Sequence, residues 1–179
     1  MRLRSSILLC ALSVGLFSAN KIAIAAQPQD PCVLPSSLQE EITKKYPHTH
    51  LVTLADLDEY DQKLFRKDHG SACPGLVKVD FYGDQKPTFA IVLVSGENPN
   101  RKAQLVVARQ VDGSWQTRLL DTTDGTPVVW RDRPGKYEGM SEPSTIRAKN
   151  PVIVFCGLES WAIVYAWNGK DVEKLQVSN

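Results

Sequence analysis

At residues 76–82 the sequence reads Leu-Val-Lys-Val-Asp-Phe-Tyr, and at residues 89–94 it reads Phe-Ala-Ile-Val-Leu-Val. In the first stretch Val77, Val79 and Phe81 fall at every second position, which is the period of a half-buried strand. The second stretch is apolar at every position, which is typical of a central strand covered on both faces. The turn residues 83–87 separate them. The two stretches therefore predict β-structure from residue 76 onward.

The remainder of the chain continues this pattern of short apolar segments and turns. Further strands are predicted over residues 102–111, 115–120, 126–130, 152–156, 161–167 and 171–177. Asp112-Gly113 and Asn168-Gly169 lie between successive strands, and such pairs are typical of tight hairpin turns. Successive hairpins predict an antiparallel meander.

The segment before residue 76 has helical periodicity instead. Ser37 with Glu40, and Asp56 with Glu59, have the spacing of capping boxes at helix starts. Apolar residues at helical spacing follow both signals and predict helices over 38–46 and 57–68. Helices followed by strands favour an α+β fold. We expect two N-terminal helices packed on a curled antiparallel meander of about seven or eight strands.

The first 25 residues have the three parts of a secretory signal peptide. Arg2 and Arg4 give a positive start, an apolar run covers residues 7–17, and Ala23-Ile24-Ala25 is a cleavage site. The apolar run is shorter than the roughly 20 residues that span a bilayer. We expect cleavage after Ala25, a single domain over residues 26–179, and a periplasmic or secreted protein without a stable membrane anchor.

Composition narrows the classes of partner. Removal of residues 1–25 lowers Lys plus Arg from 21 to 18 against 20 acids, so the net charge becomes −2. Such a balance lacks the basic footprint of a nucleic-acid-binding protein. An apolar fraction of 42% is sufficient for a packed core.

Three cysteines remain after removal of the leader, and an oxidising compartment allows one disulfide among three alternative pairings. Cys156 lies in the apolar run 152–156, where a free cysteine behaves as a small buried hydrophobe. Cys32 and Cys73 lie in irregular, proline-flanked segments beside the predicted helices. We therefore favour a Cys32–Cys73 bridge.

Candidate catalytic and metal-binding groups are few. His48 and His50 would share one face of a strand and could begin a metal site, or be two exposed polar residues. Asp80 and Asp84 bracket a turn that resembles part of the calcium loops of integrin-like repeats, although Tyr82 occupies a ligand position. The sequence contains no G-x-S-x-G nucleophile elbow, no phosphate-binding glycine-rich loop and no cofactor motif.

The segment 131–144 is rich in Gly, Pro and charge and is predicted to be a long loop. Long loops on a rigid sheet are common recognition sites. The candidate binding residues in it are Arg131, Arg133, Lys136, Tyr137 and Met140.

Several pieces of the chain together resemble a group of uncharacterised exported bacterial proteins. These pieces are the early Cys32, the segment Asp56-Leu57 through Leu64-Phe65-Arg66, Cys73-Pro74-Gly75, and the ending Val164-Tyr165-Ala166-Trp167-Asn168-Gly169. The resemblance supports the Cys32–Cys73 pairing and the meander, and it implies no activity. The piece Ile42–Pro47 followed by strands is also similar to small exported inhibitor-type domains.

These observations favour a non-enzymatic binding or inhibitor-like role toward another envelope or secreted protein. Two alternatives remain open at this stage. One is an envelope-polymer hydrolase that uses dispersed carboxylates, and the other is a calcium-stabilised module.

Overall fold

The computed structural model of the protein describes residues 30–97, 99–140 and 144–178. The predicted signal peptide lies outside these residues. Two α-helices, α1 (Ser36–Lys45) and α2 (Glu59–His69), and a short 3-10 helix, η1 (Leu54–Asp56), precede most of the strands. Within the described residues no helix is long and apolar enough to cross a membrane. The protein is α+β, as the order of helical and strand periodicities predicted.

The strands form two sheets and a separate hairpin, and every pairing between them is antiparallel. Sheet A consists of β1 (His50–Leu51), β2 (Leu76–Val79), β3 (Thr88–Ser95), β4 (Lys102–Val111) and β5 (Ser114–Asp124). Sheet B, in spatial order, consists of β11 (Val172–Ser178), β10 (Trp161–Trp167), β9 (Val152–Gly157) and β6 (Val128–Asp132). The hairpin consists of β7 (Gly135–Glu138) and β8 (Thr145–Ala148). The described residues thus contain more strands than the seven or eight expected, and they divide between layers instead of forming one curled meander.

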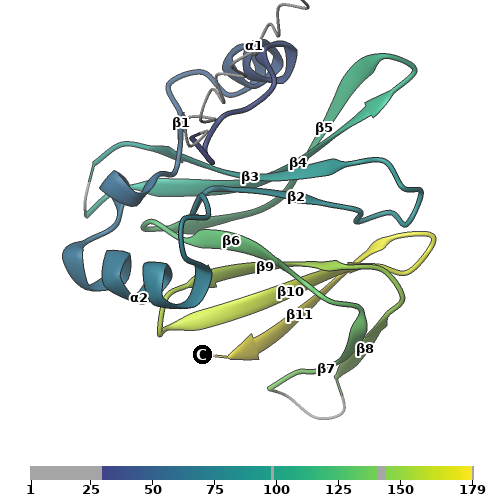
Figure 1. Ribbon diagram of the computed structural model, residues 1–179. Helices are drawn as coiled ribbons and strands as arrows, with labels where there is room; N and C mark the ends of the chain where they lie inside the picture. The colour runs from purple at the N-terminus through teal and green to yellow at the C-terminus, as the bar shows by residue number, and fades with distance from the viewer. Residues whose placement is uncertain (1–29, 98, 141–143, 179) are drawn as a thin grey trace, which may run out of the picture.

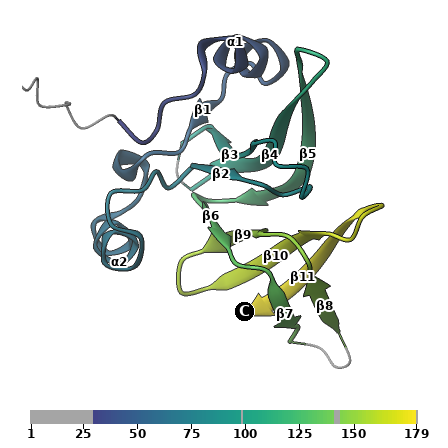
Figure 2. The ribbon, with the colours of Figure 1, turned by 45° about the vertical axis from the view of Figure 1, so that its right-hand side comes forward.

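The two sheets lie face to face with the main core between them (Figure 2). Their facing sides carry Val92 and Val107 from sheet A and Ile153, Phe155 and Tyr165 from sheet B, all at most 2% exposed. Alternation along each strand produces this arrangement, because every second side chain of a strand points to the same face. Burial between two such faces is the main stabilising term of a sandwich.

Helix α1 covers the outer face of sheet A (Figure 1). Leu38 and Ile42, one helical turn apart, pack against Ile91 and Leu93 of β3. The indole Nε1 of Trp115 donates a hydrogen bond to the Ser37 hydroxyl at 2.9 Å and ties the helix to β5. Strand β3 is therefore covered on both faces, which agrees with its uninterrupted apolar sequence.

Helix α2 does not lie on a sheet face but closes one end of the sandwich (Figures 1 and 2). Phe65, which is fully buried, and Leu57 belong to the main core with residues of both sheets. The His69 ring stacks between Phe65 and Trp130 of β6, with ring centroids 4.8 and 4.7 Å apart. At the opposite end no helix of the described residues covers the sandwich, and the exposed β2–β3 and β10–β11 connections lie there (Figure 1).

The prediction of a long loop over residues 131–144 is wrong. Residues 131 and 132 complete β6, and residues 135–138 form β7, which pairs with β8. Ile146 and Ala148 of this hairpin are buried against the outer face of sheet B, with Tyr137 packed beside them. Gly, Pro and charge obscured the strand because only one face of the hairpin is apolar.

Both predicted capping boxes are also wrong in detail. Helix α1 begins at Ser36 with Pro35 before it, and its N-terminus has no side-chain cap. The cap of α2 is Asp58, whose carboxylate accepts a hydrogen bond from the Asp61 N–H at 2.8 Å. Asp56 instead caps η1 by accepting from the backbone N–H of Thr53 at 2.9 Å.

Two of the local predictions are confirmed. Cys32 and Cys73 form a disulfide with their Cα atoms 5.0 Å apart, and Cys156 is a free, buried cysteine. Asp112 and Gly113 both have positive φ angles, 49° and 79°, as the expected type I′ hairpin turn requires. The bridge holds the N-terminal segment before α1 to the segment that enters β2.

Candidate functional site

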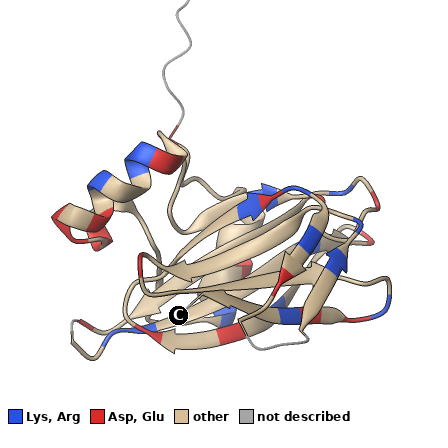
Figure 3. Ribbon diagram, turned by 90° about the horizontal axis from the view of Figure 1, so that it is seen from below, with Lys and Arg blue, Asp and Glu red and all other residues tan. Residues whose placement is uncertain are grey.

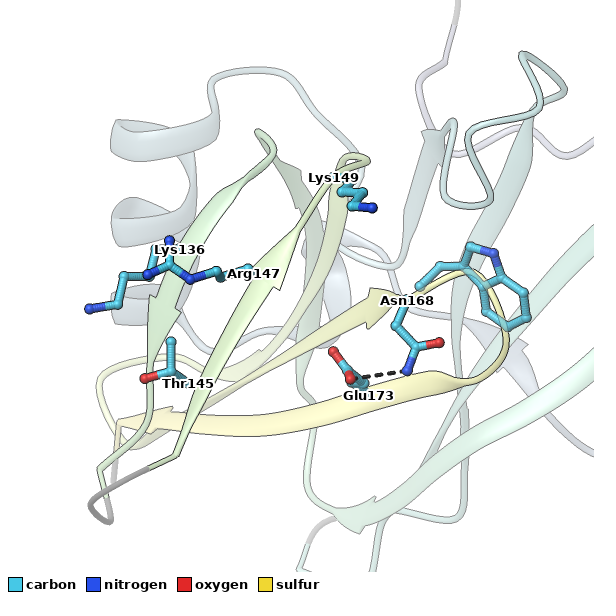
Figure 4. A pocket seen from close by; sticks show the side chains of 7 residues that line it. Lys136, Thr145, Arg147, Lys149, Asn168 and Glu173 are labelled. Carbon is cyan, nitrogen blue, oxygen red and sulfur yellow. Dashed lines mark hydrogen bonds between the residues drawn. The ribbon is translucent and has the colours of Figure 1, made fainter.

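A cleft of about 570 Å³ opens between the β7–β8 hairpin and the β10–β11 turn (Figure 4). We call it the hairpin cleft. It is lined by Lys136, Thr145, Arg147, Lys149, Trp167, Asn168 and Glu173. Three cations and one acid thus line a concave surface that also has an aromatic ring.

Strand register explains why the cations gather there. Lys136 lies directly opposite Arg147 in the β7–β8 ladder, so both side chains leave the same face of the hairpin. The neighbouring residues Tyr137 and Ile146, also a cross-strand pair, point the other way and pack on sheet B. The apolar face thereby fixes the hairpin on the sheet and leaves the cationic face in solvent.

The far wall of the cleft is shaped by the β10–β11 turn. The side-chain oxygen of Asn168 accepts hydrogen bonds from the backbone N–H groups of Lys170 and Asp171 at 2.9 and 2.8 Å. Its amide nitrogen donates to the Glu173 carboxylate at 3.0 Å, as the dashed line in Figure 4 shows. These side-chain bonds stabilise the β10–β11 turn in addition to its backbone hydrogen bonds, and the turn forms one wall of the cleft.

The charges of the cleft are only partly compensated within the protein. Lys136 forms an ion pair with Glu138 on its own strand. In the described part of the chain neither Arg147 nor Lys149 takes part in an ion pair. Elsewhere, Figure 3 shows Lys and Arg interspersed with Asp and Glu. The cleft therefore presents a local excess of positive charge on a surface of mixed sign.

The five candidate binding residues are not brought together. Lys136 lines the hairpin cleft, whereas Tyr137 packs on sheet B and its hydroxyl donates to the backbone oxygen of Arg133 at 2.5 Å. Arg131 lies on β6 and lines a separate hollow beside β2. Met140 is 50% exposed beyond the end of β7. Of the five candidate residues, Lys136 alone lines the hairpin cleft.

The two histidines also separate. His48 lies in a turn with a positive φ of 63° and is exposed. His50 Nε2 lies 2.8 Å from the Asp56 carboxylate, and Arg101 lies 3.6 Å from the same oxygen. Burial acts to raise the pKa of Asp56, but its hydrogen bonds from His50 and Thr53 outweigh burial and lower that pKa. This ionic cluster ties the η1 turn to β1 and to Arg101, the residue before β4.

Asp80 and Asp84, in the turn that resembles a calcium loop, accept hydrogen bonds from the backbone of that same turn. The Asp80 carboxylate accepts from the backbone N–H of Gln85 at 3.2 Å, and the Asp84 carboxylate accepts from that of Lys86 at 3.1 Å. In the described residues no group of three or more His, Cys, Asp or Glu is arranged to hold a metal ion.

Acids also gather where α2 meets the β9–β10 turn. The Tyr60 hydroxyl donates to the Glu159 carboxylate at 2.6 Å. Burial, with the nearby charges of Asp58 and Glu159, raises the pKa of Asp61. The cluster includes the N-cap of α2, so at least one of its carboxylates has a structural role.

The residues that sequence reasoning missed are those of β8 and the β10–β11 turn. Arg147 alternates with Ile146 and Ala148, which is a strand signal too short to stand out beside the Gly and Pro of its surroundings. Asn168 was recognised as a turn residue but not as a wall of a cleft. Strand β8 and the β10–β11 turn are far apart in the sequence, so no local sequence pattern predicts that they lie together.

Comparisons of the chain with protein-family models, with curated proteins and with solved structures find no match.

Proposed function

We propose that this protein is an exported, non-enzymatic binding protein that attaches through the hairpin cleft to an acidic segment of another envelope or secreted protein. The observation that carries the proposal is that Lys136, Arg147 and Lys149 all line one concave surface. The leader-like sequence of residues 1–25 and the Cys32–Cys73 bridge support an oxidising compartment outside the cytoplasm.

The chemistry of the cleft favours a carboxylate-rich peptide. Arg147 offers a planar fork of donors that matches a carboxylate, and the two lysines add flexible positive charge. Trp167 and Asn168 supply an apolar surface and a polar rim, which are common features of protein interfaces. Electrostatic complementarity of this kind chiefly provides specificity and fast association.

The test is a titration of the protein against a fluorescein-labelled deca-glutamate peptide, followed by fluorescence anisotropy. The triple variant Lys136→Gln, Arg147→Gln, Lys149→Gln is compared with a control triple variant Lys44→Gln, Lys67→Gln, Lys86→Gln. Both remove three positive charges, but the control residues are exposed and lie outside the cleft.

We expect the cleft variant to weaken binding by about tenfold or more, and the control variant to change it by less than about twofold. Raising the salt from 50 to 500 mM should weaken the wild-type interaction, because the contacts are exposed ion pairs. Equal losses in the two variants would show that net charge alone attracts the peptide, and would overturn the proposal.

A further inference from the structure

A second, more enclosed pocket lies at the end of the sandwich opposite α2. We call it the end pocket; its volume is about 240 Å³. The residues that line it include Tyr82, Thr88, Arg109, Gln116, Arg118 and Trp167. The β2–β3 connection and the β10–β11 turn, which flank it, are at the right of Figure 1, and α2 is at the left. Trp167 lines both this pocket and the hairpin cleft, so the two hollows are neighbours.

The floor of the end pocket is the inner face of sheet A. Thr88, Arg109 and Gln116 form one cross-strand row over β3, β4 and β5. The adjacent row contains Ala90, Val107 and Arg118. Side chains in such rows share a face, and Ala90 and Val107 belong to the core between the sheets.

The inner face therefore changes from apolar to polar toward this end of the sheet. Ala103, Leu105 and Val107 of β4 are buried in the core, and the next residue on that face is Arg109. On β3 the series Val94, Val92 and Ala90 ends in the same way at Thr88. An arginine and a threonine at inward positions are unusual in a sandwich core, where inner faces are apolar.

Thr88 marks the same change on β3. It is only 1% exposed, and its hydroxyl Oγ1, which has no hydrogen-bond partner among the described residues, is closed off from solvent and from the pocket. A buried hydroxyl without a partner costs folding free energy, and native proteins rarely retain one. A ligand in the end pocket would therefore meet the two arginines and not this hydroxyl.

Arg109 is held in place by aromatic contacts. Its guanidinium carbon lies 4.2 Å from the centre of the Tyr82 ring, and Tyr82 makes an edge-on contact with Trp167 at 5.0 Å. In the described part of the chain neither Arg109 nor Arg118 forms an ion pair. Two guanidinium groups without ion-pair partners among the described residues thus line the pocket.

We propose that the end pocket binds the carboxylate of a small organic acid, with the apolar part of the ligand against Tyr82 and Trp167. Guanidinium groups pair with planar carboxylates in a bidentate manner, and Arg109 and Arg118 both line the pocket. The volume is below the roughly 300–1,000 Å³ of drug-sized sites, so the ligand is a small acid or a single acidic side chain of a partner. The aromatic walls favour an organic acid over inorganic phosphate.

The probe is sodium benzoate, which combines a carboxylate with a flat apolar body. Binding to the full protein is measured by isothermal titration calorimetry, with benzamide and inorganic phosphate as comparison ligands at the same ionic strength. We expect a dissociation constant of about 1 mM or lower for benzoate, and at least about tenfold weaker binding of both comparison ligands. Capped glutamate, tested by competition, distinguishes a free acid from a partner's side chain as the source.

Variants test the roles of the two key residues. Arg109→Gln should weaken benzoate binding by about tenfold or more, whereas Arg131→Gln, an exposed arginine outside the pocket, should leave it unchanged. Thr88→Val keeps the side-chain shape and removes the unpartnered hydroxyl. It should raise the urea midpoint of the ligand-free protein and change benzoate affinity by less than about twofold, because the hydroxyl is closed off from the pocket.

A loss of affinity in Arg109→Gln without one in Thr88→Val separates a binding role from a structural one. Absence of binding at 20 mM benzoate, equal binding of benzamide, or an unchanged affinity of Arg109→Gln would each overturn the proposal. The triple variant of the hairpin cleft should still bind benzoate, so failure of the acidic-segment proposal is distinguishable from failure of this one.

Discussion

The hydroxyl of Tyr165 on β10 donates a hydrogen bond to the carboxylate of Asp121 on β5, and so links the two sheets. Lys174 of β11 donates to the same carboxylate at 2.6 Å. Burial acts to raise the pKa of Asp121, but these two bonds outweigh it and lower the pKa below its usual value. For Tyr165, burial and the bond to Asp121 both raise the pKa. The proton therefore stays on the phenol and the negative charge on Asp121.

We expect Asp121→Ala to destabilise the protein by about 1–3 kcal/mol at pH 7, because it leaves the buried Tyr165 hydroxyl without an acceptor. The matched control is Asp124→Ala on the same strand. Asp124 also pairs with a lysine, Lys102, but its side chain is 74% exposed, so the loss should be within about 0.5 kcal/mol. Urea unfolding of the three proteins measures the difference.

The pH dependence of the same contact has a definite sign. The folded-state pKa of Asp121 is depressed, so its stabilising contribution is present above the unfolded-state pKa and is lost as pH falls through the folded-state pKa. The gap in unfolding free energy between wild type and Asp121→Ala should therefore narrow as pH is lowered from 7 toward 2. A gap that stays constant over this range would contradict the assignment of charge to Asp121.

The Cys32–Cys73 bridge should make a large contribution to stability. It joins residues 41 positions apart, and the loop-entropy model gives about 4 kcal/mol for such a loop. Guanidinium-induced unfolding of Cys32→Ser, Cys73→Ser should show a loss of this order, and wild type with reductant should behave like the variant. Equal midpoints of oxidised and reduced protein would show that the bridge adds no net stability.

Gly75 lies where the chain after β1 passes the start of β2. A Cβ atom at this position would lie 2.4 Å from the backbone oxygen of Val52. Val92 binds both segments: its N–H donates to Gly75 and its oxygen accepts from the Val52 N–H. We expect Gly75→Ala to cost about 1–3 kcal/mol, because that backbone must shift. Gly135→Ala is the control, since its Cβ would meet nothing within 4 Å and should change thermal stability little.

Local patterns in the sequence predicted most of the elements. The bounds of β4 (Lys102–Val111) and β10 (Trp161–Trp167) are those expected, because both strands alternate clearly and end at turn residues. The positions of α1 and α2 were predicted within two residues. Strand and helix periodicity are local properties, and turn residues such as Asp112 and Gly113 mark where each strand stops.

The pairing of distant strands was not predictable in the same way. The chain leaves sheet A after β5, and β6 pairs with β9 in sheet B. The β7–β8 hairpin lies between β6 and β9 in the sequence. The expected meander assumed that each strand pairs with the next one in sequence, which the inserted hairpin breaks. For the same reason only Lys136 of the hairpin cleft was identified. Arg147 and Trp167 come to it through pairings that a sequence pattern does not contain.

The end pocket has a local signal in the sequence. Arg109 and Thr88 occupy the inward phase of β4 and β3, two positions from buried Val107 and Ala90 respectively. A polar residue in the apolar phase of an otherwise regular strand marks either a strand end beyond the core or a site. The two cases differ in whether the facing residues of the other sheet are also polar. Which residues of the other sheet face these strands depends on non-local packing.

Cys156 provides a test of burial that needs no variant. Its side chain is 7% exposed, and burial, with the nearby charge of Asp61, raises the pKa of the thiol to about 11. Since the thiolate is the reactive form, we expect iodoacetamide at pH 8 to leave the folded protein unmodified and to label one cysteine in urea. Reduction before labelling should expose Cys32 and Cys73 as well. Mass spectrometry of the intact protein counts the labels. Rapid labelling of the folded, oxidised protein would show that β9 opens easily or that Cys156 is not enclosed in the main core.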